Sequence, residues 1–179
     1  MWLFGYGSLV WRPAFPYVVK RPARLDGWKR RFYQASPDHR GTEEAPGRVV
    51  TLLPDASEQC WGMAYQVPEE GRDEILDALD FREKAGYERH WLPLHLSDET
   101  GHLTGEQVEG LVYVANGDNP NFIGPASMEE MAQHIYRSVG PSGDNIEYLV
   151  KLSEALAHYG VHDAHVVDLM NALRPLLDS

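Results

Sequence analysis

A glycine-containing turn near the N-terminus is the first place where this sequence could do chemistry. Residues 5–9 (GYGSL) directly follow the apolar run 2–4 (WLF), which predicts a strand. Glycine lets a backbone approach a ligand closely and adopt positive φ. Free N–H groups in such a turn can hold a carboxylate or a developing oxyanion. Taken alone, an ordinary tight turn after a strand is the simpler interpretation.

A second candidate is the charged segment 80–84 (DFREK), near the end of a predicted helix. It places Glu83 between Arg82 and Lys84, and a carboxylate in a partly dry pocket can act as a general base. Taken alone, Glu83 is more simply a solvated surface charge. The polar segment 38–41 (DHRG) is, by the same argument, more simply a loop.

Common cofactor and nucleophile motifs are missing from the sequence. Residues 5–7 (GYG) lack the third glycine of a dinucleotide fingerprint, and no regular βαβ alternation follows. There is no G-x-x-x-x-G-K-[ST] loop, and Ser8 does not lie in a G-x-S-x-G elbow. Nucleotide cofactors and elbow-type serine hydrolysis therefore lose support.

The histidines and the cysteine invite metal or thiol chemistry that their context does not favour. His158, His162 and His165 have suggestive spacing, but Gly160 ends the predicted helix between them, so we expect surface histidines and no metal. Cys60 lies in an alternating strand pattern and is predicted to be a small buried apolar residue.

The elements that position these residues predict an α+β fold, with strands first and helices packed around them later. Strand patterns occupy 2–4, 24–34, 48–53, 59–67, 87–96 and 107–114. We expect the third strand to stop at Pro54 and the fourth at Pro68, because both residues lack a backbone donor.

Helical patterns follow the strands. One helix is predicted over 69–84, with Gly86 as its C-terminal stop. Capping-box patterns at 127–130 (SMEE) and 144–147 (DNIE) predict helices that end near Gly140 and at Tyr159. A last helix is predicted from the cap Asp163 through Leu173, with Pro175 near its end.

Length, composition and charge limit the class of protein. The 179 residues fit one domain, 1–179, and 43% hydrophobic with 24% charged residues is ordinary globular composition. A net charge of −11, from 16 Lys and Arg against 27 Asp and Glu, argues against nucleic-acid and anionic-membrane partners. The basic run 29–31 (KRR) is too short to reverse this and is predicted as a solvated strand edge.

A single cysteine excludes an internal disulfide and favours a reducing compartment. The first residues carry no positive charge before their apolar stretch, which glycines soon interrupt, so we expect neither a signal peptide nor a membrane span. The resulting expectation is a cytoplasmic protein. The oligomeric state stays open, and a monomer is compatible with the sequence.

Seven segments, read together, carry more information than any one of them. They are 4–9 (FGYGSL) with Trp11, 38–41 (DHRG), 46–52 (PGRVVTL), 60–65 (CWGMAY), 80–87 (DFREKAGY), 118–120 (DNP) and 140–149 (GPSGDNIEYL). In this order they resemble the ChaC family of γ-glutamylcyclotransferases, in its glutathione-degrading branch. The resemblance runs from Trp2 to about Leu149.

The resemblance implies a fold, an activity and a set of site residues. The fold is the γ-glutamylcyclotransferase-like one, a small mixed strand barrel with flanking helices. The activity is cleavage of glutathione to 5-oxoproline and cysteinylglycine, without metal or cofactor. The family's catalytic glutamate falls on Glu83 and a pocket tyrosine on Tyr148. The γ-glutamyl-binding loop falls on Tyr6, Gly7, Ser8, Leu9, Val10 and Trp11.

The implied reaction uses the substrate's own α-amine as nucleophile, so one carboxyl group can serve first as base and then as acid. Because glutathione is an anion, local cations should help, and Arg40, Arg48 and Arg82 are the candidates; a structural ion pair explains each equally well. The turn at 6–9 either stabilises the oxyanion or grips the substrate's α-carboxylate. Two further readings stay open: cyclotransfer on other γ-glutamyl amino acids or amines, and a non-catalytic module that binds a ligand or partner.

Overall fold

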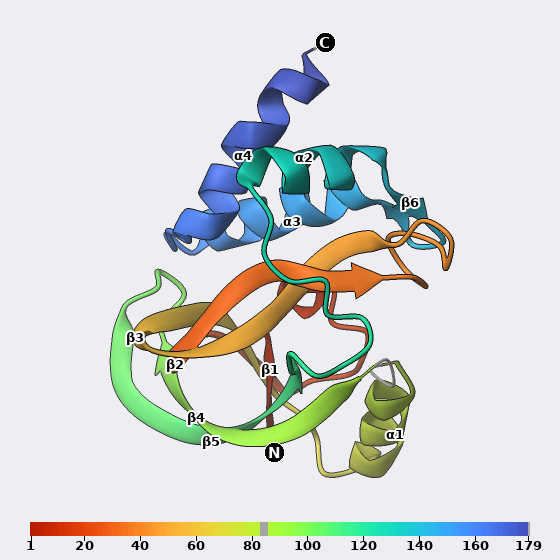
Figure 1. The fold of residues 1–179 in the computed structure, drawn as a ribbon. Coiled ribbons are helices and arrows are strands. Elements are labelled where there is room, and N and C mark those ends of the chain that lie inside the picture. Colours follow the sequence, from red (N-terminus) through yellow and green to blue (C-terminus); the bar gives the residue numbers. More distant parts are fainter. Residues whose placement is uncertain (83–85, 179) are drawn as a thin grey trace.

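The computed structural model describes residues 1–82 and 86–178. Five strands close into a barrel in the order β1-β3-β2-β4-β5 (Figure 1). The strands are β1 (Trp2–Gly5), β2 (Val19–Ser36), β3 (Gly47–Gln66), β4 (Tyr87–Ser97) and β5 (Leu103–Ala115). Neighbours pair antiparallel except β1 and β5, which are parallel. The barrel is therefore mixed, as predicted.

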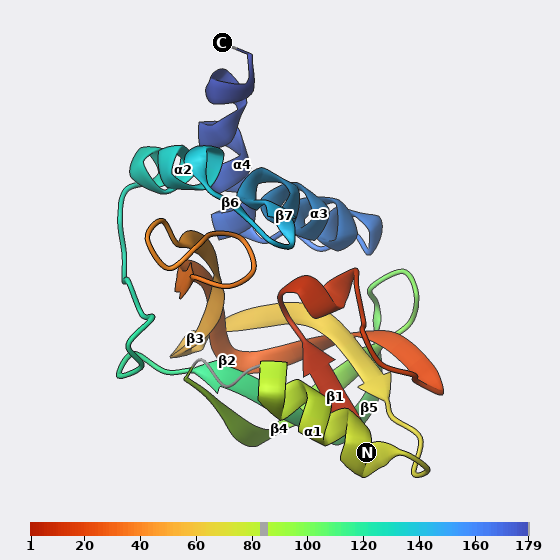
Figure 2. The ribbon, with the colours of Figure 1, turned by 90° about the vertical axis from the view of Figure 1, so that its right-hand side faces the viewer.

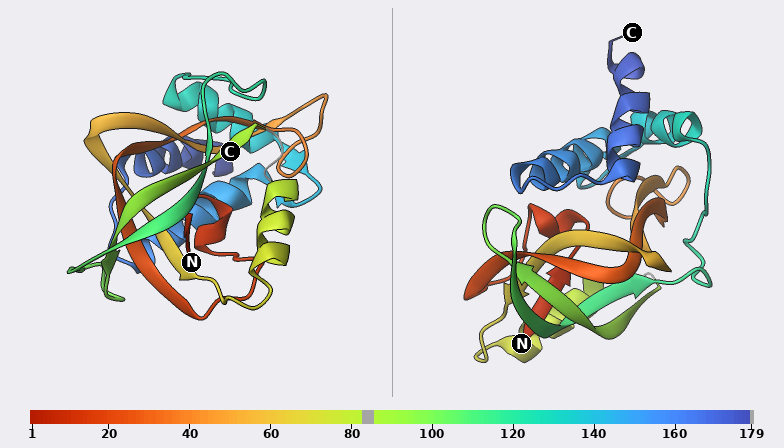
Figure 3. Two further views of the ribbon diagram at one scale, coloured as in Figure 1. Left: turned by 90° about the horizontal axis from the view of Figure 1, so that it is seen from below. Right: turned by 90° about the vertical axis from the view of Figure 1, so that its left-hand side faces the viewer.

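Helices cover the barrel at two places. The helices α2 (Met128–Arg137), α3 (Asn145–His158) and α4 (Ala164–Leu177) form a layer at one end of the barrel, and the end of α4 projects away from it (Figures 1 and 3). The helix α1 (Arg72–Arg82) lies beside β1 (Figure 2). A short hairpin, β6 (Val139–Gly140) and β7 (Gly143–Asp144), joins α2 to α3.

Two apolar clusters hold these layers together. The larger joins inward-facing barrel residues such as Phe4 and Phe32 to helix residues such as Leu149 and Leu169. The smaller packs Ile75 and Leu79 of α1 onto the outside of β1 and β5. Burial of apolar surface on both sides of the barrel is the main term that fixes the helices in place. In the described part of the chain, no helix is both long enough and apolar enough to cross a membrane.

The strand β3 corrects the prediction for its region. It is one strand of 20 residues, not two strands interrupted at Pro54. Its register with β2 jumps from Asp26–Gln59 to Trp28–Pro54, so residues 55–58 bulge outward. A bulge needs no ladder hydrogen bond from the proline, which is why Pro54 does not end the strand.

The helix boundaries also differ in detail from those predicted. The helix α1 begins at Arg72 rather than at 69, because Gly71 adopts φ +75° in a preceding turn. The capping box at Ser127 is confirmed: its hydroxyl accepts from the Glu130 N–H at 3.1 Å, and the Glu130 carboxylate accepts from the Ser127 N–H at 2.9 Å. This helix, α2, ends at Arg137, because the residues before Gly140 enter β6.

The second predicted capping box is wrong. The side chain of Asp144 caps nothing at the start of α3, and Glu147 pairs with Arg40 at 2.7 Å instead. Asp163 does cap α4, accepting from the Val166 N–H at 3.2 Å. That helix passes Leu173 and includes Pro175, which it tolerates within its final turn.

Two predictions of surface exposure are also wrong. Arg30, in the centre of the basic run, is only 1% exposed. His165 is 6% exposed and its Nε2 accepts from the Phe32 N–H at 3.1 Å, while His158 and His162 are exposed as predicted. Burial lowers the pKa of His165 to about 4. Cys60 is buried as predicted, and burial raises the pKa of its thiol to about 11.

Candidate active site

The glycine-containing turn leaves β1 at Gly5 and winds directly into a short 3-10 helix, η1 (Ser8–Val10). The Val10 N–H donates to the Gly7 carbonyl at 3.0 Å, and the Arg12 N–H donates to the Ser8 carbonyl at 2.8 Å. Gly7 is the N-cap residue and has no side-chain capping bond. The first N–H groups of such a turn have no acceptor within the helix.

Three long side chains anchor this turn from the barrel side. The Nε of Arg30 donates to the Tyr6 carbonyl at 2.9 Å, and the Tyr65 hydroxyl donates to the Leu9 carbonyl. The Tyr6 hydroxyl donates to the Tyr113 carbonyl at 2.7 Å. The carbonyl groups of Tyr6 and Leu9 are therefore already held by side chains of the barrel strands.

Close packing, rather than positive φ, explains the two glycines of the turn. Neither Gly5 nor Gly7 has positive φ. A Cβ on Gly5 would lie 2.5 Å from the Leu9 Cβ, and one on Gly7 would lie 2.6 Å from the Tyr148 hydroxyl oxygen. The sequence-based suggestion of positive φ is thus wrong at both positions, whereas the close approach that glycine permits is used.

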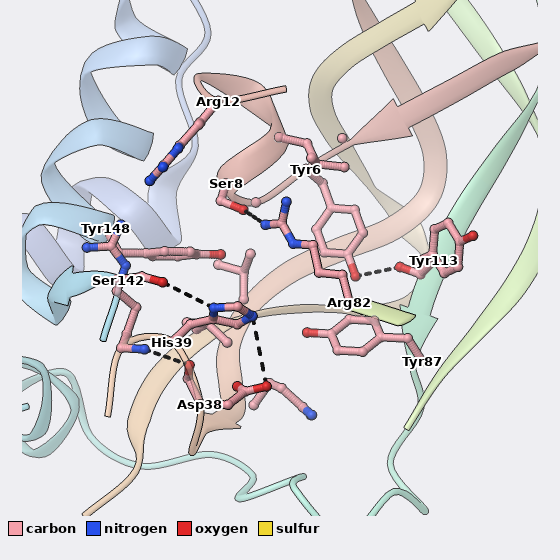
Figure 4. A pocket seen from close by; sticks show the side chains of 18 of the residues that line it. Tyr6, Ser8, Arg12, Asp38, His39, Arg82, Tyr87, Tyr113, Ser142 and Tyr148 are labelled. Atoms are coloured by element: carbon pink, nitrogen blue, oxygen red, sulfur yellow. Dashed lines mark hydrogen bonds and ion pairs between the residues drawn. The ribbon is translucent and has the colours of Figure 1, made fainter. Parts of the chain in front are cut away.

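A pocket of about 320 Å³ opens beside the turn (Figure 4). This volume is in the range of small-molecule sites. Its walls come from the turn, the loop after β2, the end of α1, β4, β5, the β6–β7 turn and α3. Of the residues predicted from the sequence, it is lined by Tyr6, Gly7, Ser8, Leu9, Trp11, Arg40, Arg82 and Tyr148.

Two predicted site residues lie elsewhere. Val10 is buried in the main core. The Arg48 guanidinium donates to the carbonyls of Phe32 at 2.6 Å and Gly124 at 3.1 Å, tying β2 to the segment before α2. In the described structure neither side chain lines the pocket, so a direct contact with substrate has no geometric support for them.

Tyr148 and Arg40 form one wall of the pocket. The Tyr148 ring packs edge-on against Trp11 at 5.2 Å between centroids, and the Arg40 guanidinium carbon lies 5.8 Å from the Tyr148 centroid. Arg40 also donates to the Asp144 carbonyl at 2.8 Å and to Glu147 at 2.7 Å. The hydrogen bond and charge of Arg40 hold the pKa of Glu147 below its usual range.

The end of α1 forms the opposite wall. Arg82 donates to the Ser8 hydroxyl, which links α1 to the turn. Asp80 accepts from the Tyr113 hydroxyl at 2.7 Å and pairs with Arg89. The hydrogen bond from Arg89, then that from Tyr113, lowers the pKa of Asp80, whereas burial, then Asp80, raises the pKa of Tyr113. Tyr113 is therefore a hydroxyl donor at neutral pH.

Glu83, the predicted catalytic residue, lies outside the described residues, so its place in the pocket stays a prediction. Arg82, which precedes it directly, and Tyr87, four residues after it, line the pocket. Two lining groups, Tyr87 and Ser142, lie in segments noted in the sequence but were not predicted as site residues. Ser142 is held against the 38–41 loop, with its hydroxyl 3.1 Å from His39 Nδ1.

Sequence reasoning missed three further residues around the pocket. Arg12 follows the predicted loop by one residue and lines the pocket, as does Tyr113. Arg30 donates to the Tyr6 carbonyl of the turn. The one signal for Arg30 was its position in a strand, where it shares a face with Phe32. Over residues 1–82 and 86–178, no three His, Cys, Asp or Glu side chains are grouped to hold a metal ion; a metal-free reaction stays a prediction.

Comparison with known proteins identifies the family. The family model described as "ChaC-like protein" matches residues 1–175. The chain belongs to the ChaC-like family. It is 41% identical to "Gamma-glutamylcyclotransferase 2-3" of Arabidopsis thaliana, over 99% of this chain and 90% of that relative. It is 39% identical to "Glutathione-specific gamma-glutamylcyclotransferase 1" of Homo sapiens, over 99% of this chain and 80% of that relative.

Solved structures place this ChaC-like chain in the predicted fold. It superposes on the crystal structure of a yeast γ-glutamyl cyclotransferase specific to glutathione with a TM-score of 0.90 at 32% identity, covering 98% of this chain and 96% of the other. A structure titled "Gamma-glutamyl cyclotransferase", 13% identical, gives a TM-score of 0.55 over 94% of this chain and 85% of the other, and shows the fold alone. The γ-glutamylcyclotransferase-like fold predicted from the sequence is confirmed.

Proposed function

We propose that this chain is a glutathione-specific γ-glutamylcyclotransferase that cleaves glutathione to 5-oxoproline and cysteinylglycine. The observation that carries the proposal is the 39% identity over nearly the full chain to the Homo sapiens relative of that printed name. The Schizosaccharomyces pombe relative "Glutathione-specific gamma-glutamylcyclotransferase", 37% identical over 97% of this chain, supports it. The proposal includes a cytoplasmic location and a single domain over 1–179.

In this reaction one carbon–nitrogen bond forms and another breaks. The α-amine nitrogen of the γ-glutamyl group attacks the γ-carbonyl carbon, and a five-membered lactam ring closes. The bond between that carbon and the cysteine nitrogen then breaks. No water is consumed. Because nucleophile and electrophile belong to one molecule, holding the γ-glutamyl chain folded supplies much of the rate advantage. A pocket built from fixed backbone and packed aromatic rings suits this task.

Glu83 is the proposed proton carrier. The α-amine is mostly ammonium at neutral pH, so a base must take a proton before attack. The same carboxyl group then returns the proton to the leaving cysteine nitrogen. The placement of Arg82 and Tyr87 in the pocket wall supports this role, because Glu83 is bonded directly to Arg82.

The turn at Tyr6–Leu9 is the proposed anion cradle. Its carbonyl groups at Tyr6 and Leu9 already accept hydrogen bonds from Arg30 and Tyr65. The uncapped start of η1 is consistent with N–H groups that donate to a substrate oxygen. That oxygen belongs either to the oxyanion of the tetrahedral intermediate or to the substrate's α-carboxylate. The packing of Tyr148 against Gly7 supports its place beside the same group.

The test is a product assay with millimolar glutathione, in which 5-oxoproline and cysteinylglycine are measured together. The parent protein should form both in equal amounts. Glu83→Gln keeps the size of the side chain and removes its basicity, so activity should fall by at least about a hundredfold, given the usual 10²–10⁴ contribution of a general acid–base group. The matched control is Glu99→Gln in the exposed β4–β5 turn. Equal activity of Glu83→Gln and parent would remove Glu83 from this role.

A broader substrate range is the second candidate. The Arabidopsis thaliana relative at 41% identity is named a γ-glutamylcyclotransferase without a stated substrate. Competition of glutathione against γ-glutamyl-alanine and γ-glutamyl-lysine separates the two candidates. Strict preference for glutathione supports the first. Tight glutathione binding without any product would instead favour a non-catalytic binding module.

A further inference from the structure

We propose that Arg12 binds the C-terminal carboxylate of the substrate and thereby selects a tripeptide over a γ-glutamyl dipeptide. This inference rests on the proposed function. Arg12 lines the pocket with an exposed side chain. Among the ion pairs formed within the described residues, none involves its guanidinium.

The other two arginines of the described pocket wall are already engaged. Arg40 is 5% exposed and is held by Glu147 and by the Asp144 carbonyl. Arg82 donates to the Ser8 hydroxyl. Arg40 is therefore held in a direct ion pair with Glu147, whereas Arg12 forms no such pair within the described residues. In a protein of net charge −11, an exposed cation of this kind is the local feature that attracts an anionic ligand.

The backbone of Arg12 is held in place by the turn. Its N–H donates to the Ser8 carbonyl at 2.8 Å, and the preceding residue, Trp11, packs on Tyr148. Figure 4 shows the Arg12 side chain on the Tyr148 side of the turn and Arg82 on the Tyr113 side. Electrostatics agrees: Arg12 is among the charges that lower the pKa of Glu147, after the larger effect of Arg40. Arg12 thus belongs to the Arg40 end of the pocket.

Glutathione has a carboxylate at each end, and the pocket has a cationic group at each end. Under the proposed mechanism, the γ-glutamyl end lies by Ser8 and Arg82, next to Glu83. The other two residues of the substrate must then extend away from there, and three extended residues span about 10 Å. One tyrosine side chain covers the corresponding stretch of wall: the Tyr148 hydroxyl touches Gly7, and its ring lies 5.8 Å from Arg40. The second carboxylate therefore arrives where Arg12 is.

The experiment crosses enzyme variants with substrates. Parent and Arg12→Gln are assayed with glutathione, with γ-glutamylcysteine, and with glutathione whose glycine carboxylate is an amide. We expect Arg12→Gln to lower kcat/KM for glutathione about tenfold, mainly through KM, as expected for one charge-assisted hydrogen bond. Glutathione amide lacks the negative charge, and the cysteine carboxylate of γ-glutamylcysteine ends one residue short of Arg12, so both substrates should be unaffected. Arg12→Lys should restore part of the loss. The matched control is Arg174→Gln, which removes the same charge from an exposed arginine on α4.

Binding separates failure of this inference from failure of the proposed function. Calorimetry of glutathione and γ-glutamylcysteine on the Glu83→Gln background needs no turnover. A roughly tenfold weaker binding of glutathione alone in Arg12→Gln supports the inference, even for a parent that forms no 5-oxoproline. Equal loss with all substrates would assign Arg12 to the structure of the turn, and no loss would remove it from recognition. Either result overturns the inference.

Discussion

The buried ion pair between Arg30 and Asp163 makes a sharp stability prediction. Asp163→Asn removes the carboxylate charge but keeps a residue that can still cap α4. It leaves the Arg30 guanidinium, with its side chain fully buried, without the partner that now lies at 2.7 Å. Breaking a buried pair by removing one partner costs about 3–5 kcal/mol. Because Asp163 is 16% exposed, we expect the lower end, about 3 kcal/mol.

The partner substitution tests the same argument from the other side. Arg30→Met removes the charge and leaves the carbonyls of Tyr6 and Trp61 without their donor. Each unsatisfied buried carbonyl costs about 1–3 kcal/mol. In the double variant no arginine charge is left unpaired, so its cost should be clearly less than the sum of the two single costs.

Urea unfolding measures these differences through the midpoint at constant slope. The matched control is Asp168→Asn, an exposed aspartate on the same helix. A change of less than about 1 kcal/mol for Asp163→Asn, which is the scale of an exposed pair, would refute the reasoning. Strictly additive costs in the double variant would refute it too. Because Arg30 holds the Tyr6 carbonyl, Arg30→Met should also lower kcat at temperatures where the protein stays folded.

Three further predictions follow from single contacts. Gly7→Ala places a methyl group 2.6 Å from the Tyr148 hydroxyl oxygen, so kcat/KM should fall at least about tenfold, and adding Tyr148→Phe should recover part of the loss; no recovery would mean that the clash lies elsewhere. Ser127→Ala removes one half of a capping box and should lower the free energy of unfolding by about 1 kcal/mol, measured in urea, with no change in KM. The pKa of His165 is lowered to about 4, so below its ordinary value of 6.5 the unfolded chain binds the proton first and stability falls as pH drops. Between pH 6.5 and pH 5 this amounts to about 1.6 kcal/mol, and His165→Gln should flatten the profile.

The sequence predicted the type of most elements because their patterns are local. Alternation gave the strands, and Ser127 and Asp163 marked helix starts by their caps. Pro54 misled because a bulge that tolerates proline depends on the register with β2, which no local pattern records. The exposure of Arg30 was misjudged for a similar reason. Its strand face was readable, but its partner Asp163 comes from the other end of the chain.

The site itself was predicted only in part. The sequence did not predict the contacts between residues that lie far apart along the chain. The turn at Tyr6–Leu9 was recognised as a chemical motif, and the structure brings it to Tyr148 through a contact at Gly7. Arg48 looked equivalent to Arg40 in the sequence, since both are arginines in polar or mixed segments. Only the fold separates them. The Arg40 side chain lies in the pocket wall, whereas the Arg48 side chain donates to the Gly124 carbonyl in the segment before α2.

The parallel pairing of β1 with β5 has a consequence for how the protein is made. During synthesis the residues that form the turn leave the ribosome first, yet β1 cannot find its partner at residues 110–112 until more than half of the chain has followed. Tyr148, which packs on the turn, and Asp163, which pairs with Arg30, emerge later still. Once β3 has paired with one edge of β1, the other edge must therefore wait unpaired for β5, and a nascent or shortened chain without α3 and α4 carries no finished pocket. The pocket is therefore finished only after α3 has been made.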